Sequence, residues 1–187
     1  MKKVFGVATC DLTGVRGTKP YSTWKNMLRR CYSHYDYNQA SYEGCTVTPE
    51  WLLYSTFKQW FDENYVEGYA LDKDIIKKNN LLYSPETCCF VPQEINALLI
   101  KGKRRRGKLP IGLVLCRRNK YKKYKVQVKG RTPYSVGYFS SIEEAFQTYK
   151  REKEKVVKER ATKYFQEGKI TQRVYQALME YQVENTD

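Results

Sequence analysis

The chain has 187 residues, 41% of them hydrophobic and 29% charged, and a formal net charge of +14. This length suits one domain or two small ones, and no apolar run approaches the roughly 18 residues that span a bilayer. The first residues are too few and too polar for a secretory signal, so we expect a cytoplasmic protein. Six cysteines without a C-x-x-C pair argue against a zinc knuckle or a disulfide framework, and we expect reduced thiols.

The excess positive charge is local. Between Lys101 and Arg131 there are fourteen Lys or Arg residues and no Asp or Glu, whereas elsewhere twenty basic residues balance twenty acidic ones. Such a cluster releases counterions when it meets a phosphate backbone, which predicts a nucleic-acid partner. A solvated basic linker or a membrane-surface patch is the alternative, but only residues 101–108 lack apolar side chains and no amphipathic helix accompanies the charge.

Residues 1–20 form a lead-in with little periodicity, and an aromatic module follows at 21–100. Apolar residues spaced i, i+3, i+4, i+7 predict a helix that starts near Tyr21, with Pro20 before it. A second helix is expected after Pro49. The apolar faces of the two helices hold Trp24, Met27, Leu28 and Cys31, and then Trp51, Tyr54, Phe57, Trp60 and Phe61.

A strand–strand–helix unit ends this module. Leu71–Ile76 and Cys88–Val91 read as two strands, with a turn at Asn79-Asn80 between them. Pro92 suits the first position of a short helix that runs through Leu99. Residues 101–108 then form a basic linker, in which we expect Arg104, Arg105 and Arg106 to contact DNA.

The second domain, 109–187, reads as a small sheet followed by helices. Three strands are expected at 111–115, 124–128 and 134–139. A helix should start at Ser140 or Ser141, since Glu144 follows in a capping pattern, and stop at Gly168. Thr171 should cap a last amphipathic helix. The expected fold class is therefore α+β, with a three-stranded antiparallel sheet on a long helix.

The middle strand has two unlike faces. Tyr124, Val126 and Val128 alternate with basic and polar side chains, which predicts one helix-packed face and one bare face. Lys and Arg pair with guanine, Gln pairs with adenine, and the remaining cations bind phosphates. Tyrosines among the lysines can stack on bases or bond phosphates. The residues expected to face DNA here are Arg117, Arg118, Lys123, Lys125, Gln127, Lys129 and Tyr138.

Residues 109–158 resemble the plant ethylene-response-factor (Apetala-type) DNA-binding domain. The matching segments, in order, are Pro110-Ile-Gly112, Tyr124-Lys-Val-Gln-Val128, Val136-Gly-Tyr-Phe139, and Ser141-Ile-Glu-Glu-Ala145 with Tyr149. The family reads the DNA major groove with its three-stranded sheet. The resemblance implies the same use of the bare face in this chain. Similar domains occur fused to HNH nucleases in phage and bacterial homing endonucleases.

Residues 21–100 resemble the HNH part of those phage-type fused endonucleases. The matching pattern is Tyr21-x-x-Trp24-x-x-Met27-x-x-Arg30-Cys-Tyr32, then Glu50-Trp51, Phe57, Trp60, Leu71-Asp72-Lys73, Tyr83-Ser-Pro-Glu86, Cys88 and Asn96. The resemblance implies a ββα-metal core that hydrolyses DNA phosphodiesters with a divalent metal, Mg²⁺ or Mn²⁺. It also implies a phage protein that acts in the bacterial host cell.

The catalytic pattern of that family is incomplete in this chain. Lys73 stands at the position of the family's general-base His, and Thr87 stands at the central Asn. Asp72 and Asn96 remain as oxygen ligands for the metal, with Lys73 or a metal-bound water in place of the base. A lysine is a poor base near neutral pH. The alternative is that residues 72–74 are surface charges on a structural hairpin.

The sequence is therefore compatible with two classes of function. One is a metal-dependent HNH-like endonuclease with Asp72, Lys73 and Asn96 as catalytic residues. The other is a catalytically inactive protein that binds double-stranded DNA on a retained HNH scaffold. A phage protein that binds a host protein or RNA is a further alternative. We expect neither a membrane nor a small molecule as partner, and the sequence leaves the oligomeric state open.

Overall fold

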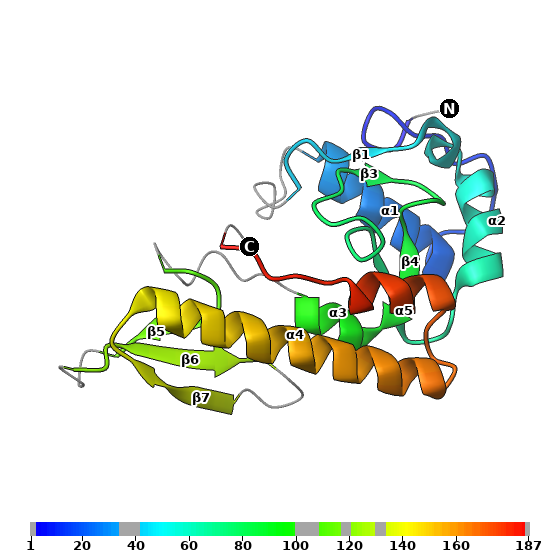
Figure 1. Ribbon diagram of the computed structural model, residues 1–187. Helices are drawn as coiled ribbons and strands as arrows, with labels where there is room; N and C mark the ends of the chain where they lie inside the picture. Colours follow the sequence, from blue (N-terminus) through cyan, green and yellow to red (C-terminus); the bar gives the residue numbers. More distant parts are fainter. Residues whose placement is uncertain (1–2, 34–41, 100–108, 117–120, 130–133, 186–187) are drawn as a thin grey trace. The chain divides into compact units, whose positions relative to one another are not determined.

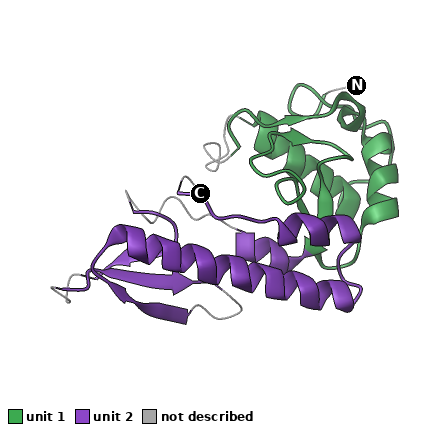
Figure 2. Ribbon diagram, in the orientation of Figure 1, with its two compact units in different colours: residues 1–91 green, residues 92–187 purple. Residues whose placement is uncertain are grey.

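The computed structural model describes residues 3–33, 42–99, 109–116, 121–129 and 134–185 (Figure 1). The fold is α+β, as predicted. The chain divides into two compact units, Met1–Val91 and Pro92–Asp187, each with its own hydrophobic core (Figure 2). None of the described helices combines the length and the apolarity needed to cross a bilayer.

Two helices build the core of the first unit. Helix α1, Lys19–Tyr32, has Pro20 in its first turn and buries the predicted face of Trp24, Met27 and Leu28. A 3-10 helix at Pro49–Leu52 leads into α2, Tyr54–Asn64, so the expected second helix begins later than its proline. The Trp24 indole donates a hydrogen bond to the Trp51 carbonyl at 2.7 Å, which joins the two segments in the core.

Four short strands complete the first unit. Strand β1, Thr46–Val47, pairs in parallel with β3, Leu82–Tyr83. Strand β2, Tyr69–Asp72, pairs with β4, Cys89–Pro92. The strand expected at 71–76 thus ends at Asp72, where the chain turns. The β1–β3 pair was not predicted, because two residues per strand are too few to show a period of two.

The lead-in belongs to the core of this unit. Ala8 is fully buried, and Thr9 forms a parallel bridge with Leu53. The Asp11 carboxylate accepts a hydrogen bond from the Ser55 amide at 2.9 Å, in the first turn of α2. The segment from Ala8 to Asp11 therefore holds the start of α2 in place, in spite of the weak periodicity of the lead-in.

The second unit contains the predicted antiparallel sheet, in the order β5–β6–β7. Its strands are Leu113–Leu115, Tyr124–Val128 and Tyr134–Phe139. Helix α4, Ile142–Gln166, runs along one face of the sheet (Figure 1). Ser141 caps α4 by accepting a hydrogen bond from the Glu144 amide at 3.4 Å, as the capping pattern predicted.

Gly112 lets β5 approach α4 closely. Its φ of +81° is in the left-handed region, and a Cβ atom at this position would lie 2.0 Å from the Tyr149 ring. Around this contact the core is made by Ile111, Leu113, Val126, Val128, Ala145, Phe146, Tyr149 and Val183. Only glycine therefore fits at residue 112 with the sheet seated on the helix.

Helix α3, Gln93–Leu99, belongs to the second unit because its side chains bond to α4. Glu94 accepts a hydrogen bond from the Tyr164 hydroxyl and lies 3.6 Å from the Arg160 guanidinium. Lys153 donates to the Leu98 carbonyl at 2.5 Å. The unit boundary thus falls before this helix, at 91–92, whereas the sequence suggested residues 101–108.

Helix α5 and the chain after it complete the second unit. Helix α5, Gln172–Met179, begins at the Thr171 cap, as predicted, and α4 ends before Gly168, whose φ is +66°. The following segment packs on α4, where Val183 accepts from the Lys150 ammonium at 2.8 Å through its carbonyl and donates its amide to Glu154 at 2.9 Å.

Candidate nucleic-acid interface

The middle strand β6 presents two different faces, as its alternation predicted. Val126 and Val128 are fully buried against α4, whereas Lys125 and Gln127 are partly exposed on the opposite side. Among the described parts of the second unit, the helix that packs on the sheet is α4, and it lies on the valine side. Lys125 and Gln127 therefore stand on a sheet face that no described helix of this unit covers.

Cross-strand neighbours extend this face. Lys125 pairs with Val114 on β5 and with Tyr138 on β7, while Gln127 pairs with Ser135 after a register shift that skips Val136 of β7. The Lys125 ammonium lies 5.9 Å from the centroid of the Tyr138 ring, a cation–π distance. We call Val114, Lys125, Gln127, Ser135 and Tyr138 the outer face.

The other residues predicted to bind DNA have different positions. Lys123 and Lys129 are exposed at the two ends of β6, and their backbone carbonyls accept hydrogen bonds from Cys116 and Lys153. Both can contribute charge at the rim of the outer face. The predicted residues that lie outside the described parts of the chain are Arg104, Arg105, Arg106, Arg117 and Arg118.

One lysine of the second unit has a structural role. Lys153 is 3% exposed, and its ammonium bonds to the carbonyl of Leu98 in the last turn of α3 and to that of Lys129 after β6. Burial, followed by the charge of Lys129, lowers the pKa of Lys153 to about 8. This ammonium ties α3 and the end of the sheet to α4, so it is not part of the exposed charge.

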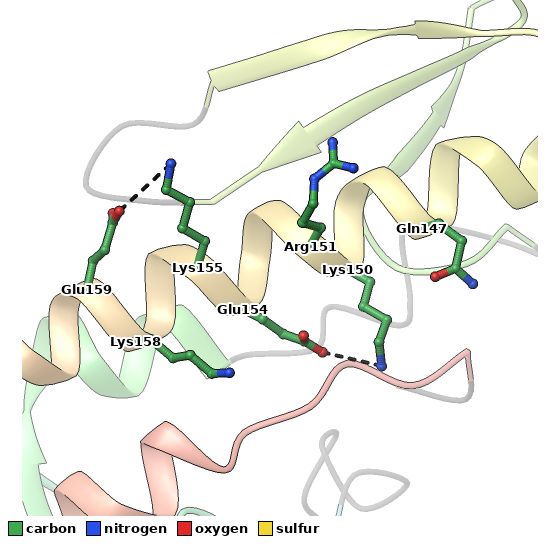
Figure 3. A pocket seen from close by; sticks show the side chains of 7 residues that line it. All are labelled: Gln147, Lys150, Arg151, Glu154, Lys155, Lys158 and Glu159. Carbon is green, nitrogen blue, oxygen red and sulfur yellow. Dashed lines mark ion pairs between the residues drawn. The ribbon is translucent and has the colours of Figure 1, made fainter.

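A second charged surface lies along α4. It is a hollow of about 480 Å³, lined by Gln147, Lys150, Arg151, Glu154, Lys155, Lys158 and Glu159 (Figure 3). Two of its lysines are paired with its own carboxylates, Lys150 with Glu154 at 3.3 Å and Lys155 with Glu159 at 4.0 Å. Lys150 and Lys155 are thus compensated within the hollow, and Arg151 pairs with Glu152 at 3.3 Å.

In the first unit, the Asp72 carboxylate closes a turn. One of its oxygens accepts the amides of Asp74 and Ile75, at 2.7 and 2.9 Å, directly after β2. Burial raises the pKa of Asp72, while the two amide hydrogen bonds act in the opposite direction. This geometry explains why β2 ends at residue 72.

Lys73 is buried, with 6% of its surface exposed, so it is not the surface charge that the hairpin alternative assumed. Its ammonium donates to both carboxylate oxygens of Asp74, at 2.8 and 2.9 Å, and to the Asn80 carbonyl at 2.5 Å. An ammonium has three protons, all of them engaged here, and no lone pair with which to take a proton from water. This arrangement supports a structural role for Lys73 in the loop between β2 and β3.

The two predicted metal ligands belong to different units, Asp72 to the first and Asn96, half-buried on α3, to the second. Neither unit by itself therefore holds both ligands. Among the residues that the structure describes, no group of three or more His, Cys, Asp or Glu side chains is placed to hold a metal ion. The six cysteines all lie in the described parts of the chain, none of them forms a disulfide, and each is buried or half-buried.

Sequence reasoning missed two members of the outer face, Val114 and Ser135. Both are exposed and lie opposite the predicted residues of β6. The alternation of β5 could have identified Val114, since Leu113 is buried and Val114 must point the other way. Comparisons with protein-family models, with curated proteins and with solved structures found no significant match.

Proposed function

We propose that this protein binds double-stranded DNA through the outer face of its three-stranded sheet. The observation that carries the proposal is the position of Lys125 and Gln127 on a sheet face that no described helix of the unit covers. This face lies largely within the stretch from Lys101 to Arg131, which holds fourteen basic and no acidic residues. Positive charge on an accessible sheet attracts a phosphate backbone, and the polar side chains can then reach base edges.

The dimensions of the sheet also support this proposal. Neighbouring strands lie about 4.8 Å apart, so the three strands β5, β6 and β7 span about 10 Å between the outer two. The major groove of B-DNA is about 12 Å wide and exposes a different donor and acceptor pattern for each base pair. The groove admits two strands side by side, so side chains of the outer face on β6 and one neighbouring strand can reach the bases in it.

The double variant Lys125→Ala, Gln127→Ala tests the proposal. We expect DNA affinity to fall by about 1–3 kcal/mol for each base contact removed, with the fold unchanged, because neither side chain belongs to the core. Fluorescence anisotropy with a labelled duplex would measure the affinity, and circular dichroism would report the fold.

The matched control is Lys158→Ala, Gln147→Ala, which removes the same two residue types from the hollow on α4. We expect this control to change affinity little. A larger reduction in affinity for the α4 variant than for the sheet variant would place the DNA on α4 and contradict the proposal.

Metal-dependent DNA cleavage is the second candidate function. It is supported by the chain order of β2, β4 and α3, a strand–strand–helix order that ends β2 at Asp72 and places Asn96 on the helix. The engaged ammonium of Lys73 supports the alternative, in which the first unit is a scaffold without a general base. On both accounts the DNA is bound by the second unit.

A plasmid-nicking assay with Mg²⁺ or Mn²⁺ separates these accounts. If the site is active, Asp72→Asn abolishes nicking, because it removes a carboxylate ligand, while DNA binding persists. Asparagine is the appropriate substitution, since its side-chain oxygen can still accept the amides of Asp74 and Ile75. Absence of metal-dependent nicking by the natural chain would leave the first unit as a scaffold.

A further inference from the structure

The outer face combines one cation, one amide and two apolar groups in a fixed arrangement. Val114 and Tyr138, 45% and 42% exposed, flank Lys125 on the two neighbouring strands. Gln127 is two residues further along β6, about 6.7 Å away at 3.3–3.4 Å per residue. The two positions are therefore separated by about two steps of a DNA strand, at 3.4 Å each.

Each of these side chains has a preferred partner in a major groove. A Gln amide both donates and accepts, and it matches the N6 and N7 atoms of adenine. The thymine methyl is the apolar group that the groove offers, and it is contacted by apolar side chains. Val114 and the Tyr138 ring are thus suited to thymine, and Gln127 is suited to adenine.

Lys125 can bind guanine or a phosphate. Its ammonium is held over the Tyr138 ring, at 5.9 Å from the centroid, between the two apolar neighbours. In this position the Lys125 ammonium can bind a phosphate beside a thymine methyl group that Val114 or Tyr138 contacts. The described outer face contains no arginine, the side chain that pairs with guanine through two hydrogen bonds.

We infer that the outer face distinguishes A·T from G·C base pairs, with Val114 and Tyr138 against thymine methyl groups and Gln127 on an adenine about two base pairs further along. This inference rests on the proposed DNA binding and specifies the base pairs that the same surface selects. Two features of the major groove allow this distinction. The methyl group identifies thymine, and the N6 and N7 atoms, which a Gln side chain can bond, identify adenine.

The experiment compares three duplexes of equal length with the full chain at one salt concentration. The first is A·T-rich, the second is G·C-rich, and the third is the A·T-rich duplex with every thymine replaced by uracil. Uracil keeps the pairing and the adenine edge and removes only the methyl group. We expect the tightest binding to the first duplex and about tenfold weaker binding to the uracil duplex, the effect of two buried methyl groups.

Single variants assign the contacts. Val114→Ala should reduce the preference for thymine over uracil, and Gln127→Ala should reduce the preference for A·T over G·C. Leu115→Ala is the matched control, because Leu115 is 47% exposed on the same strand but points to the other side of the sheet. The control should keep both preferences.

The possible results separate the preference for A·T base pairs from DNA binding itself. Equal affinity for the three duplexes, or a G·C preference, overturns the inference and leaves DNA binding in place. Failure to bind any duplex, or tighter binding to a double-stranded RNA of the same sequence, overturns both. A preference for thymine over uracil that Val114→Ala removes supports both.

Discussion

Gly112→Ala should destabilise the second unit by about 3 kcal/mol. The new methyl group would lie 2.0 Å from the Tyr149 ring, and residue 112 has a φ of +81°, which L side chains rarely adopt. Either β5 must lift from α4 or the Tyr149 ring must leave the core, and an overpacked core costs about 1–3 kcal/mol before the backbone strain is added. Chemical denaturation followed by circular dichroism measures the change.

Gly168→Ala is the control for the backbone strain. Gly168 lies in the same unit, after α4, with a φ of +66° and open space around its Cβ position. We expect this variant to cost about 1 kcal/mol, the strain alone. If the two variants proved equally stable, the sheet would not be seated on Tyr149 as the structure shows.

Much of the second unit could be predicted from the sequence. Its strands alternate along β6, its long helix opens with a serine and a glutamate in capping positions, and Thr171 marks the start of α5. These signals come from residues that are close together in the sequence. They determine where a helix or strand begins and which of its faces is buried. The position of α3 in this unit was not predictable, because it depends on contacts of Glu94 and Leu98 with residues more than fifty positions away.

In the first unit, the sequence pattern alone does not decide between a metal site and a structural turn. By the family resemblance Asp72 stands at a metal-ligand position and Lys73 at that of the general base, and in the structure these side chains close a turn and pair with the Asp74 carboxylate. Residue types alone cannot separate these uses, since an aspartate carboxylate can bind a metal ion or accept backbone amides. The hydrogen bonds of Lys73 to Asp74 and Asn80 distinguish them, and these bonds depend on how the loop folds.

Part of the outer face could be predicted from the sequence. Alternation placed Lys125 and Gln127 on one side, which the structure confirms. Tyr138 was predicted as well, whereas the pairing of Ser135 with Gln127 depends on the register of β6 and β7, which shifts between Val126 and Gln127. A bulge of this kind changes which side chains meet across strands and carries no clear sequence signal.

We propose that basic residues of the stretch from Lys101 to Arg131 hold the phosphate backbone of DNA. With roughly six phosphates neutralised, the logarithm of the binding constant should fall with the logarithm of salt concentration with a slope of about -5. Affinity should therefore drop about a thousandfold between 50 and 200 mM salt.

The most direct test is a titration of a labelled duplex with the full chain across this range of salt concentrations. Our account predicts a linear log–log plot with a slope of about -5, from the basic stretch between Lys101 and Arg131. A slope near zero, or no measurable binding at 50 mM salt, would contradict it.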